Sequence, residues 1–208
     1  MIYLIGGPPR SGKTIIAKKI SKSWISADII ESMVVSYINK KDLKRLFPKS
    51  IIRVKTKQSN DAMYNSYSAK EIVKAYIKQA RASWKAIETM ITCELKEGHD
   101  YIIEGHQIHP QLIARIIKKH KKINIVPIIL TRFDKDEIVS GCQKHETEND
   151  WFIQKTKNKE TYYKIAEMIS VYSDFFEREA KKYKLKVINM DGDFKKQSQV
   201  VVKYLKNA

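Results

Sequence analysis

The feature that most constrains this chain is a short glycine-containing segment close to its start. Residues 7–14 read Gly-Pro-Pro-Arg-Ser-Gly-Lys-Thr, directly after an apolar run at residues 2–5 and directly before a helix-like segment. This is the Gly-x-x-x-x-Gly-Lys-Thr pattern of a phosphate-binding loop, in the strand–loop–helix setting that such a loop requires. With four fixed positions, a chance match in a chain of this length is about a one-in-a-hundred event. The pattern therefore predicts a nucleoside triphosphate as the ligand and disfavours a glycine-rich turn that binds nothing.

Glycine and proline determine what the first part of this segment can do. Gly7 and Gly12 can take backbone angles that are closed to residues with a Cβ atom, so the chain can wrap around a phosphate. Pro8 and Pro9 have no N–H group and a fixed φ, which stiffens the first half of the loop. We therefore expect the hydrogen-bond donors to be the amides of residues 10–14, at a helix N-terminus that favours an anion.

The later side chains of the segment carry the charge and the hydroxyl that a triphosphate needs. Lys13 is predicted to reach the β- and γ-phosphates, and the hydroxyl of Thr14 is predicted to bind Mg²⁺. Arg10 is expected to face either solvent or the substrate. The residues of the loop predicted to bind the nucleotide are Gly7, Arg10, Ser11, Gly12, Lys13 and Thr14.

Length and composition limit the class of protein. The chain has 208 residues, of which 43% are hydrophobic, which suits one well-buried core and excludes a disordered protein. The apolar start at residues 1–5 is too short for a signal peptide or a membrane span. Cys93 and Cys142 lack metal-ligand spacing and suggest neither a disulfide scaffold nor a zinc site. We therefore expect a single cytoplasmic domain over residues 1–208, without a membrane partner.

The net charge of +17 raises the question of a nucleic-acid partner. Most of the lysines, however, fall at the ends and on the polar faces of expected helices, as on an ordinary solvated surface. No segment interleaves basic and aromatic residues as a groove for single strands does. Nucleic-acid binding is therefore possible but not favoured, and anionic small substrates explain the charge equally well.

Strand-like and helix-like segments alternate along the chain, which is typical of a parallel sheet covered by helices on both faces. Strands are expected at residues 2–5, 24–26, 101–104, 123–130 and 185–189. Helices are expected at residues 13–23, 28–47, 68–97, 111–120, 134–144 and 160–184 and at the C-terminus, with residues 48–60 polar and irregular. Right-handed crossovers restrict the possible strand orders, and the order 2-3-1-4-5 is the predicted one. The sequence thus predicts a three-layer α/β fold with its ligand crevice at the carboxyl ends of the strands.

Two acids and two histidines are candidates for that crevice. Glu104 ends an apolar strand, where it can hold the hydration shell of Mg²⁺, orient a nucleophile or merely cap the following loop. Asp28 follows a short strand and is predicted to be either a helix N-cap or the base that accepts the proton of an acceptor hydroxyl. For His106 and His109, contact with substrate or a place on the surface is favoured over a metal site, because no other ligands accompany them.

A lysine-rich stretch at residues 144–160 has no apolar periodicity and precedes a long expected helix. In a phosphotransferase, such a stretch would be a mobile lid that neutralises the transferring phosphoryl group and excludes water. The lid cations predicted to contact the nucleotide are Lys144, Lys155 and Lys157. The alternative is a solvated loop.

Three segments make the chain resemble the nucleoside monophosphate kinase-like group of small-molecule kinases, and most of all 2-phosphoglycerate kinase and its relatives. They are residues 4–14 (LIGGPPRSGKT), residues 25–28 (ISAD) and residues 97–110 (EGHDYIIEGHQIHP). The order of the expected elements also fits this group over nearly the whole chain. The resemblance implies the P-loop NTPase fold, and it implies that Asp28 and Glu104 lie at the acceptor side.

The predicted function is ATP-dependent transfer of a phosphoryl group to a hydroxyl of a small anionic metabolite, with ATP and Mg²⁺ as cofactors. Lys13, Asp28 and Glu104 are the predicted catalytic residues, and Thr14 and Glu104 the predicted metal ligands. A kinase that acts on a nucleic-acid end or a nucleotide sugar is the alternative among enzymes. From another class, a nucleotide-dependent switch or a nucleic-acid-binding ATPase without a small-molecule acceptor stays open.

Overall fold

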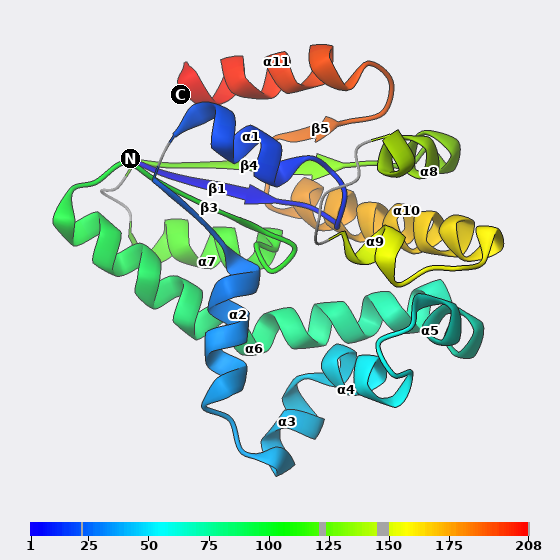
Figure 1. Cartoon of the computed structure of the whole chain (residues 1–208). Helices are drawn as coiled ribbons and strands as arrows, with labels where there is room; N and C mark the ends of the chain where they lie inside the picture. The colour runs from blue at the N-terminus through cyan, green and yellow to red at the C-terminus, as the bar shows by residue number, and fades with distance from the viewer. Residues whose placement is uncertain (22, 121–123, 145–149, 208) are drawn as a thin grey trace.

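Five parallel strands form one sheet at the centre of the computed structural model, which describes residues 1–21, 23–120, 124–144 and 150–207, with residues 142–144 described by their backbone alone. The strand order is β2-β3-β1-β4-β5, and every neighbouring pair is parallel (Figure 1). The strands are β1 (Ile2–Gly6), β2 (Trp24–Ser26), β3 (Tyr101–Gly105), β4 (Ile125–Thr131) and β5 (Val187–Asn189). The predicted fold class and strand order are confirmed.

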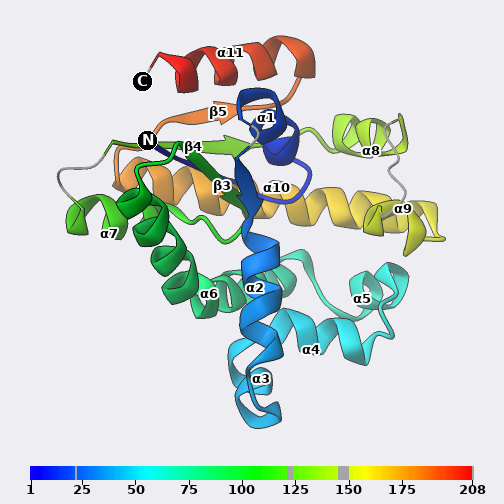
Figure 2. The same ribbon diagram turned by 60° about the vertical axis from the view of Figure 1, so that its left-hand side comes forward.

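Helices cover both faces of the sheet, as Figures 1 and 2 show. On one face lie α1 (Lys13–Ile20) and α11 (Phe194–Lys206), and on the other lie α6 (Ala69–Glu97), α7 (Pro110–Lys119) and α10 (Lys159–Lys182). Three shorter helices pack along α6, namely α2 (Ala27–Ser36), α3 (Lys40–Leu46) and α4 (Pro48–Lys55), and α5 (Asn60–Ser66) packs against α10. The remaining helices are α8 (Lys135–Lys144) and α9 (Trp151–Gln154). No helix in the described part of the chain combines the length and the apolar character needed to cross a membrane.

The alternation of side chains along each strand builds two hydrophobic cores, one on each face of the sheet. Leu4 and Ile103 are fully buried in the core beneath α6, α7 and α10, whereas their neighbours Ile5 and Ile102 are fully buried in the core beneath α1 and α11. This two-sided burial explains why the strands read as near-continuous apolar runs. It also fixes the carboxyl ends of β1 and β3 in the middle of the sheet.

The strand register places the functional segments side by side. Gly6 pairs with Gly105, and Glu104 pairs with Ile5 on one side and with Ser26 on the other. The loops that follow β1 and β3 and the helix that follows β2 therefore leave the same edge of the sheet. This edge is the predicted ligand crevice.

The segment between β2 and α6 differs from the expectation. Residues 28–47 form two helices rather than one, because the side chain of Asn39 accepts a hydrogen bond from the amide of Asp42 and so begins α3 as a new helix. Residues 48–60 are helical rather than irregular over α4. Pro48 begins α4, where its missing N–H group costs nothing. The short helix α5 was not predicted either.

Candidate active site

The loop between β1 and α1 needs glycine at the two positions that the motif fixes. Gly7 and Gly12 have φ angles of 148° and 86°. A Cβ atom at Gly7 would lie 2.3 Å from the carbonyl oxygen of Leu130, and one at Gly12 would lie 2.5 Å from the ring of Phe194. Gly12 also occupies the N-cap of α1, where no side chain caps the helix. The first amides of α1 are therefore left to a ligand or to water.

Lys13 is buried, with 7% of its surface exposed, and its ammonium group donates to the carbonyl oxygen of Pro8 at 2.6 Å. Burial lowers its pKa, against the opposing charges of Glu104 and Asp28. No carboxylate of the described residues lies within ion-pair distance of this ammonium. Lys13 is thus a buried cation without an anionic partner, a state that a bound phosphate would relieve.

Thr14 and Glu104 meet across the edge of the sheet. The hydroxyl of Thr14 donates to Oε1 of Glu104 at 2.9 Å, and Glu104 is 2% exposed. Burial raises the pKa of Glu104, although the charge of Lys13 and the hydrogen bond from Thr14 oppose the shift. The Thr14 hydroxyl in the first turn of α1 and the Glu104 carboxylate at the end of β3 are oxygen donors of the kind that Mg²⁺ prefers. The residues present therefore fit a magnesium ion beside the phosphate loop.

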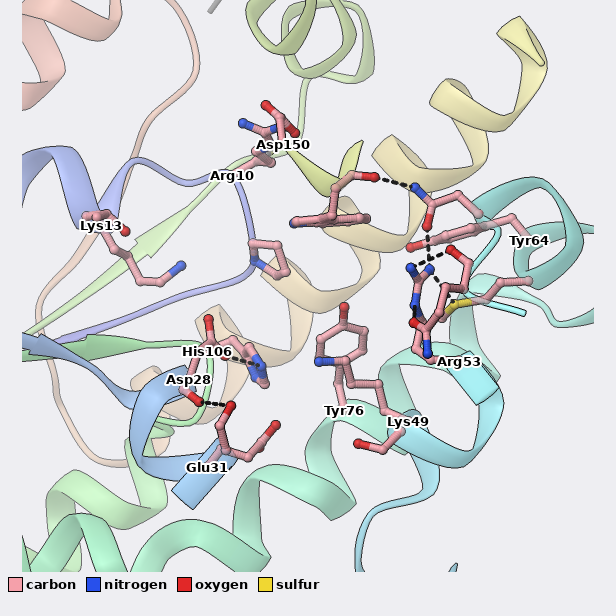
Figure 3. A pocket seen from close by; sticks show the side chains of 18 of the residues that line it. Arg10, Lys13, Asp28, Glu31, Lys49, Arg53, Tyr64, Tyr76, His106 and Asp150 are labelled. Atoms are coloured by element: carbon pink, nitrogen blue, oxygen red, sulfur yellow. Dashed lines mark hydrogen bonds and ion pairs between the residues drawn. The ribbon is translucent and has the colours of Figure 1, made fainter. Parts of the chain in front are cut away.

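A cavity of about 630 Å³ extends from this loop to the shorter helices (Figure 3). Arg10, Lys13 and Thr14 line its phosphate-loop end, and β3 contributes Glu104. Helices α2 and α4 supply charged side chains at the other end. The cavity is thus one continuous space between the phosphate loop and a wall built largely by residues 28–60, the segment whose helices were not correctly predicted.

One side of this wall is acidic and comes from α2 and the end of β3. Asp28, Glu31 and His106 lie together there (Figure 3), and the Asp28 carboxylate accepts a 2.8 Å hydrogen bond from Gln107. Ser26, not Asp28, is the N-cap of α2, because its side chain accepts from the amide of Asp28. The N-cap alternative for Asp28 is therefore wrong.

The Asp28 carboxylate is held ionised by its surroundings. Desolvation acts to raise its pKa, but the hydrogen bond and charge of His106 outweigh it and are reinforced by Lys49 and Gln107. The resulting pKa lies well below the usual range of an aspartate. Asp28 is consequently a weak base but a permanent hydrogen-bond acceptor in the cavity.

The other side of the wall is cationic and comes from α4. Lys49 and Arg53, four residues apart, both line the cavity. The Lys49 ammonium lies over the ring of Tyr76 at 4.9 Å, and the Arg53 guanidinium donates to the side chain of Asn60. Burial acts to lower the pKa of Lys49, but Tyr76 and nearby carboxylates raise it overall, so Lys49 keeps its charge. This side suits an anionic group.

Arg10 lies at the rim of the cavity and is directed at a carboxylate of this chain rather than at solvent. Its guanidinium pairs with Asp150, a buried carboxylate that also caps α9 by accepting from the amide of Phe152 at 2.9 Å. The guanidinium lies over the Phe152 ring, 5.3 Å from its centroid. The pair joins the phosphate loop to the residues that precede the long helix α10.

The structure places two of the three predicted lid cations away from the cavity. Lys155 and Lys157 are exposed and do not line it, and the side chain of Lys144 lies outside the described residues. Of the two histidines, His106 lines the cavity, whereas His109 is buried behind it with Nε2 2.9 Å from the hydroxyl of Tyr172. A surface position is therefore wrong for both.

Sequence reasoning missed four charged residues that line the cavity: Glu31, Lys49, Arg53 and Asp150. For three of them a signal exists. Glu31 stands three residues after Asp28, and Lys49 and Arg53 are four apart directly after a proline, which are the spacings of one helix face. For Asp150, whose partner is 140 positions away in the sequence, no local signal exists.

Comparison with known proteins supports the fold and reaches no further. No protein-family model matches the chain, and no curated protein matches it. Among solved structures, a gluconokinase from Sinorhizobium meliloti 1021 aligns with a TM-score of 0.53 at 6% sequence identity, covering 99% of this chain and 91% of its own. A candidate kinase from Chloroflexus aurantiacus J-10-fl aligns with a TM-score of 0.45 at 12% identity, covering 99% of this chain and 96% of its own. The chain therefore has the P-loop kinase fold.

Proposed function

We propose that this protein is an ATP-dependent phosphotransferase that phosphorylates a hydroxyl of a small anionic metabolite. The observation that carries the proposal is the single cavity that joins the phosphate loop to a wall with both acidic and cationic side chains. A nucleotide switch needs the first end of this cavity only. The second end is where an acceptor would bind. Since one fold supports many reactions, the likeness to a gluconokinase is secondary to this cavity.

The donor end would bind the triphosphate through the loop amides and Lys13. Lys13 would exchange its contact with the Pro8 carbonyl for the phosphates and stabilise the charge that develops during transfer. Thr14 and Glu104 would hold Mg²⁺, which when bound offsets negative charge on the phosphate oxygens. Arg10 would stay at the rim of this end through its pair with Asp150.

The acceptor end would bind the metabolite between its two sides. Asp28, with its lowered pKa, would orient the acceptor hydroxyl by accepting its hydrogen bond rather than by fully removing its proton. Phosphoryl transfer passes through a loose transition state in which positioning contributes more than a strong base. Lys49 and Arg53 would bind the anionic group of the metabolite. Lys144, Lys155 and Lys157 would take part only if residues 144–160 close over the cavity as a lid.

The test is a screen of phosphorylated and carboxylated metabolites for stimulated release of ADP from ATP. We expect one class of acceptor to stimulate release, and we expect Lys13→Ala to reduce turnover by about 100-fold or more. Lys19→Ala, which removes an exposed lysine of the same helix, is the matched control and should leave turnover unchanged. Undiminished phosphoryl transfer by Lys13→Ala would reject the assignment. Stimulation by an oligonucleotide instead of any metabolite would favour the nucleic-acid-binding alternative.

A further inference from the structure

The acidic side of the cavity holds three potential metal ligands at close quarters. A carboxylate oxygen of Asp28, one of Glu31 and a ring nitrogen of His106 all lie within 4.8 Å of one another. Asp28 and Glu31 are brought together by their i, i+3 spacing on α2, and His106 reaches them from the loop after β3. Figure 3 shows the three side chains converging at one end of the cavity.

These separations match those within a coordination sphere. Oxygen and nitrogen ligands lie about 2.0–2.2 Å from a divalent transition metal, so two neighbouring ligands are about 3.0 Å apart and two opposite ligands about 4.3 Å apart. The Nε2 atom of His106 lies 3.3 Å from Oδ1 of Asp28, close to the value for neighbouring ligands. Small side-chain rotations would bring all three atoms onto one ion.

The cluster also contains buried polar atoms that lack partners, which is an observation independent of the clustering of acidic side chains. His106 is 5% exposed; its Nε2 faces Asp28, whereas its Nδ1 makes no hydrogen bond with the described residues. Glu31 is 6% exposed, and its Oε2 atom is without a hydrogen bond in the same part of the chain. A buried imidazole and a buried carboxylate left in this state cost stability unless a ligand completes them.

Two buried glutamines hold the carboxylates in place. Gln79, 1% exposed, donates from Nε2 to Oε1 of Glu31 at 2.7 Å, and Gln107, fully buried, donates from Nε2 to Oδ1 of Asp28 at 2.8 Å. Metal sites characteristically have such outer hydrogen bonds, which fix the orientation of the ligating groups. Each carboxylate is thus oriented through one oxygen, and Oε2 of Glu31 is left without a partner among the described residues.

The two lysines near the cluster do not already neutralise its carboxylates. Lys49 lies against the ring of Tyr76, and Lys13 contacts the Pro8 carbonyl. Neither lysine makes an ion pair with Asp28 or Glu31 in the described structure. We propose that Asp28, Glu31 and His106 form a binding site for a divalent transition-metal ion, of the Mn²⁺ or Zn²⁺ type, at the acceptor end of the cavity.

The ligand set determines the class of ion. An imidazole nitrogen beside two carboxylates favours Mn²⁺ or Zn²⁺ over Mg²⁺, which prefers an all-oxygen shell. Three protein ligands leave positions open on the side of the cavity, as in sites where a metal also binds a substrate oxygen. The ion would therefore present an acceptor oxygen to the donor end. It is a second site, because Glu104 and Thr14 of the predicted magnesium site are not part of the cluster.

Metal binding is tested on chelator-treated protein without nucleotide or acceptor, so the result does not depend on the proposed reaction. Titration with MnCl₂, followed by electron paramagnetic resonance of free Mn²⁺, should give one bound ion per chain, and equilibrium dialysis should give the same for Zn²⁺. Glu31→Gln and Asp28→Asn keep the side-chain shapes and should weaken binding by at least about 10- to 100-fold. Electron spin-echo modulation from a ligating ¹⁴N should be present in the wild type and absent in His106→Gln.

Thr14→Ala is the matched control, because it removes a ligand of the predicted magnesium site only and should bind Mn²⁺ as the wild type does. Thermal unfolding checks that each variant is folded, and Mn²⁺ should raise the melting temperature of the wild type but not of Glu31→Gln. Wild-type binding that Glu31→Gln retains unchanged would overturn the proposal. The absence of a saturable site for both ions, or loss of the site in Thr14→Ala instead, would overturn it as well.

Discussion

The pair between Arg10 and Asp150 gives a measurable prediction about how the phosphate loop is held. The Asp150 side chain is 1% exposed and that of Arg10 is 22% exposed, so the pair is largely removed from water. The same Asp150 oxygen, Oδ1, also accepts the hydrogen bond that caps α9 at Phe152. Replacing Asp150 therefore removes an ion pair and a cap together, and the two effects can be separated.

The magnitudes follow from these two contacts. Breaking a buried pair costs about 3–5 kcal/mol, and the partial exposure of Arg10 places this pair at the lower end. Loss of the cap adds about 1 kcal/mol. We therefore expect Asp150→Ala to lower the free energy of unfolding by about 4 kcal/mol. Asp150→Asn, which keeps an oxygen for the cap, should lower it by about 2–3 kcal/mol.

The assay is urea unfolding of the four proteins of a double-mutant cycle, in which Arg10→Met is combined with Asp150→Asn. Each single replacement leaves one polar side chain of the pair without its partner. The double variant should therefore be about 2 kcal/mol more stable than the sum of the single effects predicts. Unchanged denaturant m-values would show that the unfolded states are comparable. If the single effects add to within about 0.5 kcal/mol, the two side chains act independently and the reasoning is refuted.

Two further predictions concern the buried histidine and the cationic side of the cavity. Burial holds the pKa of His109 well below its ordinary value of 6.5, so only the unfolded chain gains this proton as the pH falls. The stabilising effect of neutral His109 is complete above about pH 6.5 and declines below it by up to about 1.4 kcal/mol per pH unit. Urea unfolding of the wild type and of His109→Gln between pH 5 and pH 7 should give a smaller change of the free energy of unfolding with pH for the variant. Equal changes for the two proteins would contradict this. Lys49 lines the side of the cavity proposed to bind the anionic group of the acceptor. In steady-state assays, Lys49→Ala should therefore raise the KM of the acceptor by about tenfold or more with little change in kcat. A lower kcat at constant KM would place Lys49 outside acceptor binding.

The parts of the molecule that the sequence predicts are those fixed by local rules. The phosphate loop needs glycine at positions 7 and 12 because of positive φ angles, and this requirement is visible in the motif itself. The strands are predictable because both faces of the sheet are buried, so Leu4 and Ile5 on opposite faces are both apolar. From these two features follows the edge of the sheet that carries the cavity, because the phosphate loop leaves the carboxyl end of the first strand.

The acceptor end could not be predicted in the same way, because it depends on contacts between distant segments. The helices α3 and α4 are only 7 and 8 residues long and contain no buried residue, so neither can show the extended apolar repeat that marks the 29-residue helix α6. Arg10 pairs with a residue 140 positions away, and Asp28 is oriented by Gln107, 79 positions away. Pairings of polar side chains over such separations leave no periodic trace in one sequence.

The two ends of the cavity are therefore held by different forces, and this difference bears on specificity. The donor end is attached to β1 and β3, in which apolar side chains such as Leu4, Ile5 and Ile103 are fully buried in the two cores. The acceptor end depends on polar contacts, of which one buried side chain carries two: Gln79 donates to Glu31 on α2 and accepts from the amide of Ser50 on α4. The side-chain amide of Gln79 thus links the acidic side of the wall to the cationic side and helps to fix their relative position. Because no residue of α4 is buried, we expect that a change of acceptor requires changes in this polar wall only, while the nucleotide end stays constant.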